Sequence, residues 1–177
     1  MWRPHTLAEV ARRVEAGEAF SIAMREFLDT FYVALQRQGR VVARACLDEE
    51  PARLPDAVAH AYLGAVGEHL ALRWGLAVPA WTSDPSRFLR RPYFTIDGLE
   101  GLKARYMAES PTAFRRRLIF TEAEPLRRAR FPRFADGRAV EAHQIDELPD
   151  IYARGEKPYR LSRRRAVPPP APNSSSR

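Results

Sequence analysis

A single apolar stripe between residues 18 and 38 constrains the fold of this chain more than any other feature. Six apolar side chains recur there at helical spacing: Phe20, Met24, Phe27, Leu28, Phe31 and Leu35. Residues three or four positions apart lie on one face of a helix, and a face this wide must be covered by other elements. The pattern predicts a long helix in the hydrophobic core, which Gly39 breaks or kinks.

Helices are also predicted on both sides of this stripe. Thr6 and Glu9 have the spacing of a capping box, which indicates a short helix that ends near Gly17. Residues 41–47 resume a helical pattern before an acidic stop. Asp56 can cap a second long helix, with its apolar residues on one face, and Gly75 ends it. The first 75 residues therefore predict a set of packed helices.

The pattern changes after residue 76. Residues 76–81 contain Pro79 and have no helical period, which indicates an extended connector. Asp84 with Pro85 can then begin a helix of one or two turns that extends through Leu89. This joint makes residues 76–96 the best candidate for a hinge.

Shorter helices are predicted in the rest of the second half. One covers about 97–107, and another starts at Ser110, which can act as N-cap before Pro111. A second capping box, Thr121 to Glu124, indicates a helix to about residue 130. Together these elements predict the all-α fold class.

The length of 177 residues suits one domain followed by a tail. We expect a single compact helical domain over 1–130 and an irregular, partly docked segment over 131–159. The apolar residues that can dock there are Ile145, Leu148, Ile151 and Tyr152. Residues 160–177 are rich in Pro, Arg and Ser and predict an extended, disordered tail.

The charge is concentrated in the middle of the chain. The net charge is +7, and residues 87–130 contain 11 basic and 5 acidic side chains. Such a segment suits acidic or phosphate-bearing partners. However, 27 of the 29 basic residues are Arg, beside abundant Ala and Pro, which GC-rich codon usage also explains.

Several classes of protein are excluded by the sequence. No stretch reaches the roughly 18–20 apolar residues of a membrane span, and no secretory signal is visible, so we expect a cytoplasmic protein without a membrane partner. Cys46, the only cysteine, cannot form an internal disulfide and is expected to be a small packed residue. His60 and His69 are nine residues apart, which places them on opposite faces of a helix and prevents a shared metal.

The motifs of common enzymes are also missing. There is no GxGxxG or GxxxxGK[ST] loop, no GxSxG elbow and no HExxH pair. The acidic pair Asp146 and Glu147 lies in a polar stretch, where no perturbed pKa is expected. His60, Glu68 and His69 are the nearest titratable candidates, and their helical spacing separates them. The sequence therefore predicts a protein without catalytic activity, cofactor or metal site.

Residues 87–120 contain the strongest candidate for a binding surface, because guanidinium and aromatic side chains are interleaved there. Such groups are enriched at interfaces. The same pattern is expected if Phe114 is core and Arg115 to Arg117 form a solvated rim. The candidate partner-binding residues are Trp81, Arg91, Tyr93, Phe94, Phe114, Arg115, Arg116, Arg117 and Phe120.

A nucleic-acid-binding regulator is the alternative. The stretch TLAEVARR is typical of the first helix of a bacterial helix-turn-helix, but Glu15 stands where the turn needs Gly, and the next helix is apolar. Binding of this kind would use the N-terminal helices and the basic tail. The residues concerned are Arg12, Arg13, Arg25, Arg163, Arg164 and Arg165.

Three stretches resemble a poorly characterised bacterial family of small helical proteins. They are PAWTSDPSRFLRRPYF, LKARYMAESPTAFRRRLIF and LRRA, within a match over about residues 5–130. The family pattern reads PxW, RPWF, ESPxxFRRRNIF and a short helix ending in SRA. Leu118 stands where the pattern has Asn, and Tyr93 where it has Trp. The matching residues are Trp81, Arg91, Pro92, Tyr93, Phe94, Glu109, Ser110, Pro111, Phe114, Arg115, Arg116, Ile119 and Phe120.

The resemblance implies a binding partner and not a catalyst. Members of that family are often encoded beside nucleotidyltransferase-like genes arranged as toxin and antitoxin pairs. The resulting hypothesis is a cytosolic, antitoxin-like protein that binds and neutralises or regulates a partner protein encoded nearby. Arg115, Arg116 and Arg117 would pair with acidic metal-binding carboxylates on such an enzyme.

Overall fold

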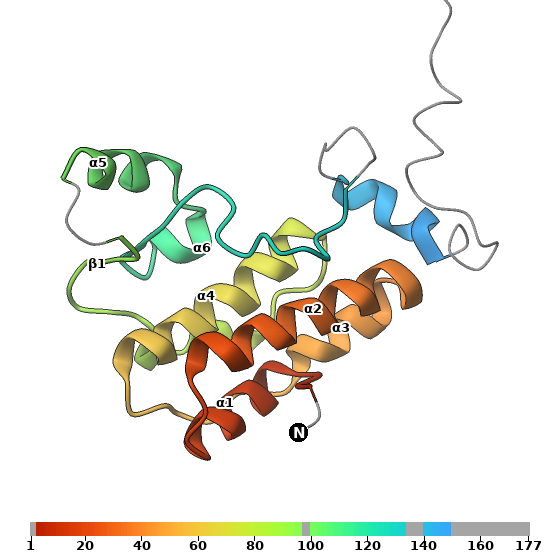
Figure 1. Cartoon of the computed structure of the whole chain (residues 1–177), viewed down its shortest axis with the longest axis horizontal. Helices are drawn as coiled ribbons and strands as arrows, with labels where there is room; N and C mark the ends of the chain where they lie inside the picture. Colours follow the sequence, from red (N-terminus) through yellow and green to blue (C-terminus); the bar gives the residue numbers. More distant parts are fainter. Residues whose placement is uncertain (1–2, 97–99, 134–139, 150–177) are drawn as a thin grey trace, which may run out of the picture.

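The computed structural model describes residues 3–96, 100–133 and 140–149, and its fold is mainly helical (Figure 1). The α-helices are α1 (Leu7–Glu15), α2 (Phe20–Gln38), α3 (Arg40–Asp48), α4 (Ala57–Arg73), α5 (Glu100–Glu109) and α6 (Thr112–Arg115). The 3-10 helices are η1 (Ala80–Ser83), η2 (Pro85–Arg87) and η3 (Ala142–Glu147). The strands are β1 (Tyr93–Phe94) and β2 (Ile119–Phe120).

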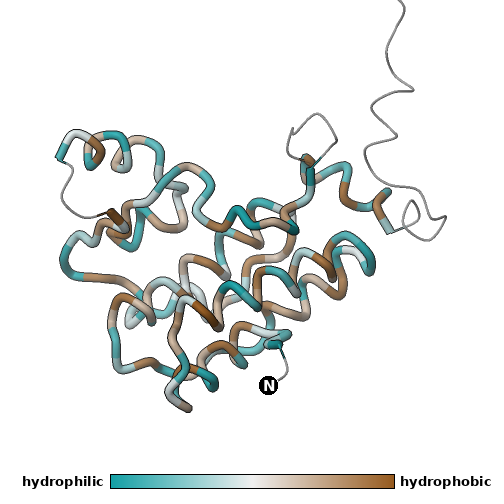
Figure 2. The backbone as a smooth tube through the Cα atoms, in the orientation of Figure 1, coloured by the Kyte–Doolittle hydropathy of each residue, from teal (hydrophilic) through white to brown (hydrophobic). Residues whose placement is uncertain are grey.

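The N-terminal helices follow the sequence closely. Thr6 and Glu9 form the expected capping box at the start of α1, and Gly17 has a φ of 96°, in the left-handed region that favours glycine. Five of the six side chains in the α2 stripe are buried, and Phe20 is partly buried against them. Figure 2 shows hydrophobic and hydrophilic residues alternating along α2, as expected for a helix with one covered face.

Helix α4 lies at the centre of the fold, between the α1–α3 layer and the segments that carry α5, α6 and β1 (Figure 1). Asp56 caps it, as predicted, and its Oδ1 accepts hydrogen bonds from the backbone N–H of Val58 and Ala59. Contrary to the expectation of one apolar face, buried residues occur all round the helix, including Gly64, Gly67 and Glu68. A helix that is buried on every side belongs to the interior of a domain.

The connector after α4 is packed against it. Both η1 and η2 contact α4, and Trp81, Thr82 and Arg87 are buried. Asp84 caps η2 as expected, although the helix ends at Arg87 and does not reach Leu89. A hinge at 76–96 stays a prediction, and bending there would have to break these contacts.

The short strands modify the expected all-α class. β1 and β2 pair in parallel, with Tyr93 opposite Ile119 and Phe94 opposite Phe120. Parallel strands need a long connection, which residues 95–118 provide through α5 and α6. This pairing was not predicted, because two-residue strands are too short to show the alternation of apolar and polar residues.

Two helix starts predicted in the second half are wrong. Ser110 does not cap α6, whose N-cap is Pro111; its Oγ instead contacts the carbonyls of Tyr106 and Thr121 and accepts the N–H of Thr121. Residues 121–130 contain no helix, because Thr121 is buried beside that serine. This segment is held by other contacts, such as the bond from the Tyr32 hydroxyl to the carbonyl of Leu126 at 2.9 Å.

The segment 140–149 docks on the helical domain. Ile145 and Leu148 are buried, as expected, and Arg40 forms an ion pair with Asp146 at 2.7 Å. Ile151, Tyr152 and the tail 160–177 lie outside the described residues. Among the helices of the described part, none is both long and apolar enough to cross a membrane.

Candidate functional site

The structure separates the predicted partner-binding residues into buried and accessible groups. Trp81, Phe114, Arg117 and Phe120 are buried, with exposed fractions of 8% or less. These four residues therefore cannot form a contact surface in this structure, which corrects their assignment. Phe94 is half-buried and stacks on Phe120. The exposed members are Arg91, Tyr93, Arg115 and Arg116.

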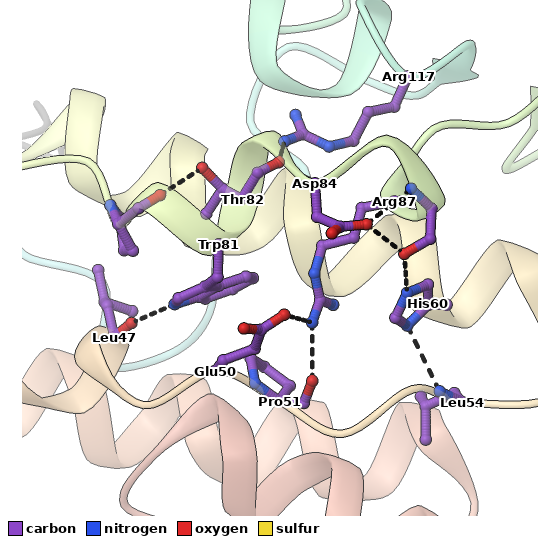
Figure 3. A network of polar contacts seen from close by, with 12 residues as sticks. Leu47, Glu50, Pro51, Leu54, His60, Trp81, Thr82, Asp84, Arg87 and Arg117 are labelled. Carbon is purple, nitrogen blue, oxygen red and sulfur yellow. Dashed lines mark hydrogen bonds and ion pairs between the residues drawn. The ribbon is translucent and has the colours of Figure 1, made fainter.

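Trp81 of the connector contacts two helices, α3 and α4. Its indole Nε1 donates to the carbonyl of Leu47 at 3.0 Å (Figure 3). The ring also lies against Gly67, where a Cβ would be only 2.7 Å from Cη2 of Trp81. The glycine therefore permits the close approach of the ring to α4.

Arg87 is buried against the ring of Trp81. Its guanidinium lies 4.7 Å from the centroid of the Trp81 ring, and its Nη2 donates to the carbonyl of Pro51 at 2.7 Å (Figure 3). The carboxylate of Glu50 is 3.4 Å away and mostly exposed. Burial is the main reason that the pKa of Arg87 is lowered. The stacking on an aromatic face compensates part of the lost hydration.

Glu68 and Arg117 form a buried ion pair nearby, where both Arg117 and Arg87 approach Gly64 of α4. Their atoms Oε2 and Nη1 are 2.6 Å apart, and Arg116 reaches the second oxygen of Glu68 at 2.9 Å. Arg117 also donates to the carbonyls of Ala113 and Thr82. Burial lowers the pKa of Arg117 despite this carboxylate. We call Glu68, Trp81, Thr82, Arg87 and Arg117 the buried polar network.

The buried polar network stabilises the fold. It joins the chain before α4, the connector after it and the turn after α6 to one central helix. Removing one partner of a buried ion pair typically costs about 3–5 kcal/mol, because the other charge is left uncompensated. The three arginines at 115–117 therefore have different environments. Arg117 is buried and stabilises the fold, Arg116 pairs with Glu68 and is partly exposed, and Arg115 is exposed.

An open groove lies beside this network, between the start of α4 and the segment that follows η1. Its volume is about 580 Å³. It contains two of the predicted partner-binding residues, Arg91 and Tyr93. We call it the arginine groove; it is lined by Arg53, Ala57, Val58, Pro85, Ser86, Phe88, Leu89, Arg90, Arg91, Pro92 and Tyr93.

Three exposed arginines distinguish this groove. Arg53, Arg90 and Arg91 line it, and no ion pair of theirs occurs within the part of the chain that the structure describes. Among the described residues, no acidic side chain lines the groove either. The groove therefore presents three guanidinium groups to solvent, which favours an anionic ligand.

A Ser, His and Asp side chain meet at the edge of the groove, but their hydrogen bonds are unsuited to catalysis. His60 Nε2 is 3.1 Å from Ser86 Oγ, and Ser86 Oγ donates to Asp84. His60 Nδ1 accepts the N–H of Leu54 at 3.4 Å, so the neutral ring carries its proton on Nε2 (Figure 3). A base would need an unprotonated nitrogen toward the serine, which this tautomer does not offer.

Of the three residues of the nucleic-acid alternative that the structure describes, two are paired. Arg12 forms an ion pair with Glu49 at 2.7 Å, and Arg13 pairs with Glu18 and Glu26. Arg25 is exposed on α2. Arg163, Arg164 and Arg165 lie outside the described residues.

The titratable residues of α4 do not form a common site. His60 contacts Ser86, Glu68 binds Arg117, and His69 packs edge-on against Phe114. Across the described ranges there is no group of three or more His, Cys, Asp or Glu side chains suited to a metal ion. Cys46 is buried, as expected.

Comparison with known proteins gives no match: no family model fits the chain, and neither the curated proteins nor the solved structures contain a similar one. The resemblance to the antitoxin-like bacterial family therefore stays a prediction.

Sequence reasoning missed the buried polar network and the role of Arg53. One signal for the network was present: Gly64 and Gly67 are three residues apart in the interior of α4. Glycine is unfavourable in a helix interior, so two of them on one face indicate a close approach by another segment. Arg53 carried no such signal, because only the folded chain brings it opposite Arg90 and Arg91.

Proposed function

We propose that this chain is a non-catalytic, antitoxin-like binding protein that docks a partner protein through the arginine groove. The observation that carries the proposal is the set of three exposed arginines, Arg53, Arg90 and Arg91, in a groove whose described lining residues include no carboxylate. Arginine and tyrosine are the residue types that most often contribute the binding energy of an interface. The groove offers both, since Tyr93 is 40% exposed there.

The buried polar network supports this assignment because it gives the groove rigid walls. Arg87 lies directly before Phe88 in one wall and is fixed through Pro51 and Trp81. Arg116 and Arg117 lie over the ring of Phe88, with 5.2 and 4.8 Å between guanidinium carbon and ring centroid. A preorganised surface loses less conformational entropy on binding than a flexible one.

The class of partner follows from the family resemblance. We propose a cytosolic nucleotidyltransferase-type toxin encoded by a neighbouring gene, which this chain neutralises or regulates. Such enzymes hold their metal ions with carboxylates, and arginines facing those carboxylates would block the site electrostatically. Arg115 is exposed and can make this contact, whereas Arg116 and Arg117 both pair with Glu68.

The test is a tagged pull-down from the native host, with half of each sample treated with RNase and DNase. The charge-reversed groove variant carries Arg53→Glu, Arg90→Glu and Arg91→Glu. Its matched control carries Arg127→Glu, Arg130→Glu and Arg133→Glu, which reverse three exposed arginines in another segment. Mass spectrometry then identifies the proteins that are retained.

The proposal expects one stoichiometric protein that resists nuclease, is lost from the groove variant and stays with the control. Recovery of the same protein with the groove variant would remove the groove from the binding site. Proteins that disappear after nuclease treatment would instead favour the nucleic-acid regulator, and the variant Arg25→Glu would then test the exposed arginine of α2.

A further inference from the structure

We infer that the arginine groove binds an acidic amphipathic segment, in which one apolar side chain lies between carboxylates. The inference rests on the proposed function and adds the chemistry of the partner segment. It follows from the distribution of apolar and charged residues in the groove.

The floor of the groove is apolar. Val58 comes from the first turn of α4, and Phe88 and Leu89 come from the facing segment. All three are partly exposed. Water on such a surface is released when an apolar side chain enters, so the floor favours a leucine-like group over a purely charged ligand.

The arginines of the groove come from two segments. Arg53 precedes α4, while Arg90 and Arg91 belong to the segment that leads to β1. A ligand whose apolar side chain contacts Val58, Phe88 and Leu89 is therefore near guanidinium groups from both segments. Carboxylates before and after that side chain would bind these arginines, and each arginine can bind a carboxylate through two parallel hydrogen bonds.

The stretch Asp146 to Leu148 has this chemistry, but Leu148 is buried and Asp146 pairs with Arg40. The tail beyond residue 152 carries six basic residues among positions 154–165, so the groove repels it. The acidic stretch 48–50 is used internally: Asp48 pairs with Arg44, Glu49 with Arg12 and Glu50 with Arg87. The occupant is therefore a segment of a different protein.

A nucleic acid fits the groove less well than such a segment. Single strands are bound by successive bases that stack on successive aromatic rings. Here Arg116 and Arg117 already stack on the partly exposed ring of Phe88, and Tyr93 is the more exposed ring of the groove, so a run of stacking rings is not offered. Phosphates on the arginines would also leave the apolar floor without a partner.

The test compares three fluorescent probes by anisotropy with the full chain. They are a short peptide with leucine between acidic residues, an oligo-glutamate peptide of equal charge, and an oligo-thymidine of equal length. The leucine peptide should bind about tenfold tighter than the oligo-glutamate, the factor expected for burial of one leucine side chain. It should also bind tighter than the oligo-thymidine.

Variants identify the groove as the site. The groove variant should lose both peptides, and the control with Arg127, Arg130 and Arg133 reversed should keep them. Val58→Ser should weaken the leucine peptide and leave oligo-glutamate binding unchanged, because it alters only the floor. Circular dichroism verifies that each variant is folded.

Equal affinity for the two peptides, or tighter binding of the oligo-thymidine, would overturn the inference. Peptide binding that the groove variant retains would do the same. These results are distinguishable from a failure of the proposed function. If the native partner depends on the groove while the peptides show no preference, only the chemistry of the segment is wrong. If the peptides behave as expected while the partner ignores the groove, the proposed function is wrong.

Discussion

The indole of Trp81 lies so close to the Cα of Gly67 that a methyl group at position 67 would be 2.7 Å from Cη2 of the ring. The ring cannot move away freely, since its Nε1 donates to the carbonyl of Leu47. Gly67→Ala should therefore lower the free energy of unfolding by about 1–3 kcal/mol through overpacking, less the ~1 kcal/mol that alanine adds in helix propensity. Urea denaturation followed by circular dichroism measures the change.

Gly101→Ala is the matched control for this substitution. Gly101 is also helical, but a Cβ there would have no neighbour within 4 Å. The change should raise the free energy of unfolding by about 0.5–1 kcal/mol. If both substitutions changed the free energy of unfolding equally, the tight contact between Trp81 and Gly67 would be contradicted.

Glu68 should be the acidic residue on which the fold depends most. Glu68→Gln leaves Arg117 buried without its carboxylate and should cost about 3–5 kcal/mol in the free energy of unfolding. Glu109→Gln removes the partner of Arg105 on the exposed face of α5 and should cost less than about 1 kcal/mol. Chemical denaturation of both variants compares the two pairs directly, and similar losses would contradict the structural role of Glu68.

Local signals in the sequence were reliable where one segment determines its own conformation. The Thr6 capping box, the α2 stripe and the Asp56 cap depend on residues within a few positions, and all are confirmed. Thr121 and Glu124 have the same spacing, yet no helix forms, because Thr121 is buried beside Ser110. Tertiary contacts can thus override a local preference, and one sequence does not reveal them.

Predicting the candidate site required more knowledge of long-range contacts than predicting the helix caps did. Arg91 and Tyr93 were predicted and are accessible in the groove, whereas Arg117 was predicted at the surface and is buried. Three consecutive arginines look equivalent in a sequence. Their environments differ because Leu118 has a φ of 59° and turns the chain directly after them. The sequence does not predict that turn, because leucine seldom adopts a positive φ.

The positive φ of Leu118 leads to a prediction about stability. Asparagine tolerates the left-handed region better than other residues with a Cβ, because its short polar side chain can bond locally. Leu118→Asn should therefore be more stable than Leu118→Ala by about 0.5–1 kcal/mol, although both lose the leucine side chain. Thermal unfolding of the pair tests it, and equal midpoints would contradict it.

Cys46 should react slowly with thiol reagents in the folded protein. Burial raises the pKa of its thiol to about 11, and its side chain is 8% exposed. The reactive thiolate is therefore scarce at neutral pH. Alkylation by iodoacetamide, measured by mass spectrometry, should be slow in buffer and fast in concentrated urea. Rapid labelling of the native chain would contradict the packed position of this residue in α3.

His69 makes the stability of the fold depend on pH in a defined window. Burial against Phe114 lowers the pKa of its imidazole from 6.5 to about 4, and the charge of Arg73 acts in the same direction. Above pH 6.5 the ring is neutral in both the folded and the unfolded chain. As the pH falls from 6.5 toward 4, only the unfolded chain binds the proton, so the free energy of unfolding decreases.

The loss attributable to His69 across this window should approach about 3 kcal/mol, from ~1.4 kcal/mol per pH unit. The pKa of His60 is lowered too, mainly by burial, and adds to the same trend. His69→Gln should flatten the dependence between pH 6.5 and 4. The carboxylates with lowered pKa, Glu26 and Asp84, titrate from an ordinary value of 4.5 or less, so their effect falls at the acid end. Urea denaturation at a series of pH values measures the slopes, and an unchanged slope for His69→Gln would show that this histidine accepts its proton in the folded state.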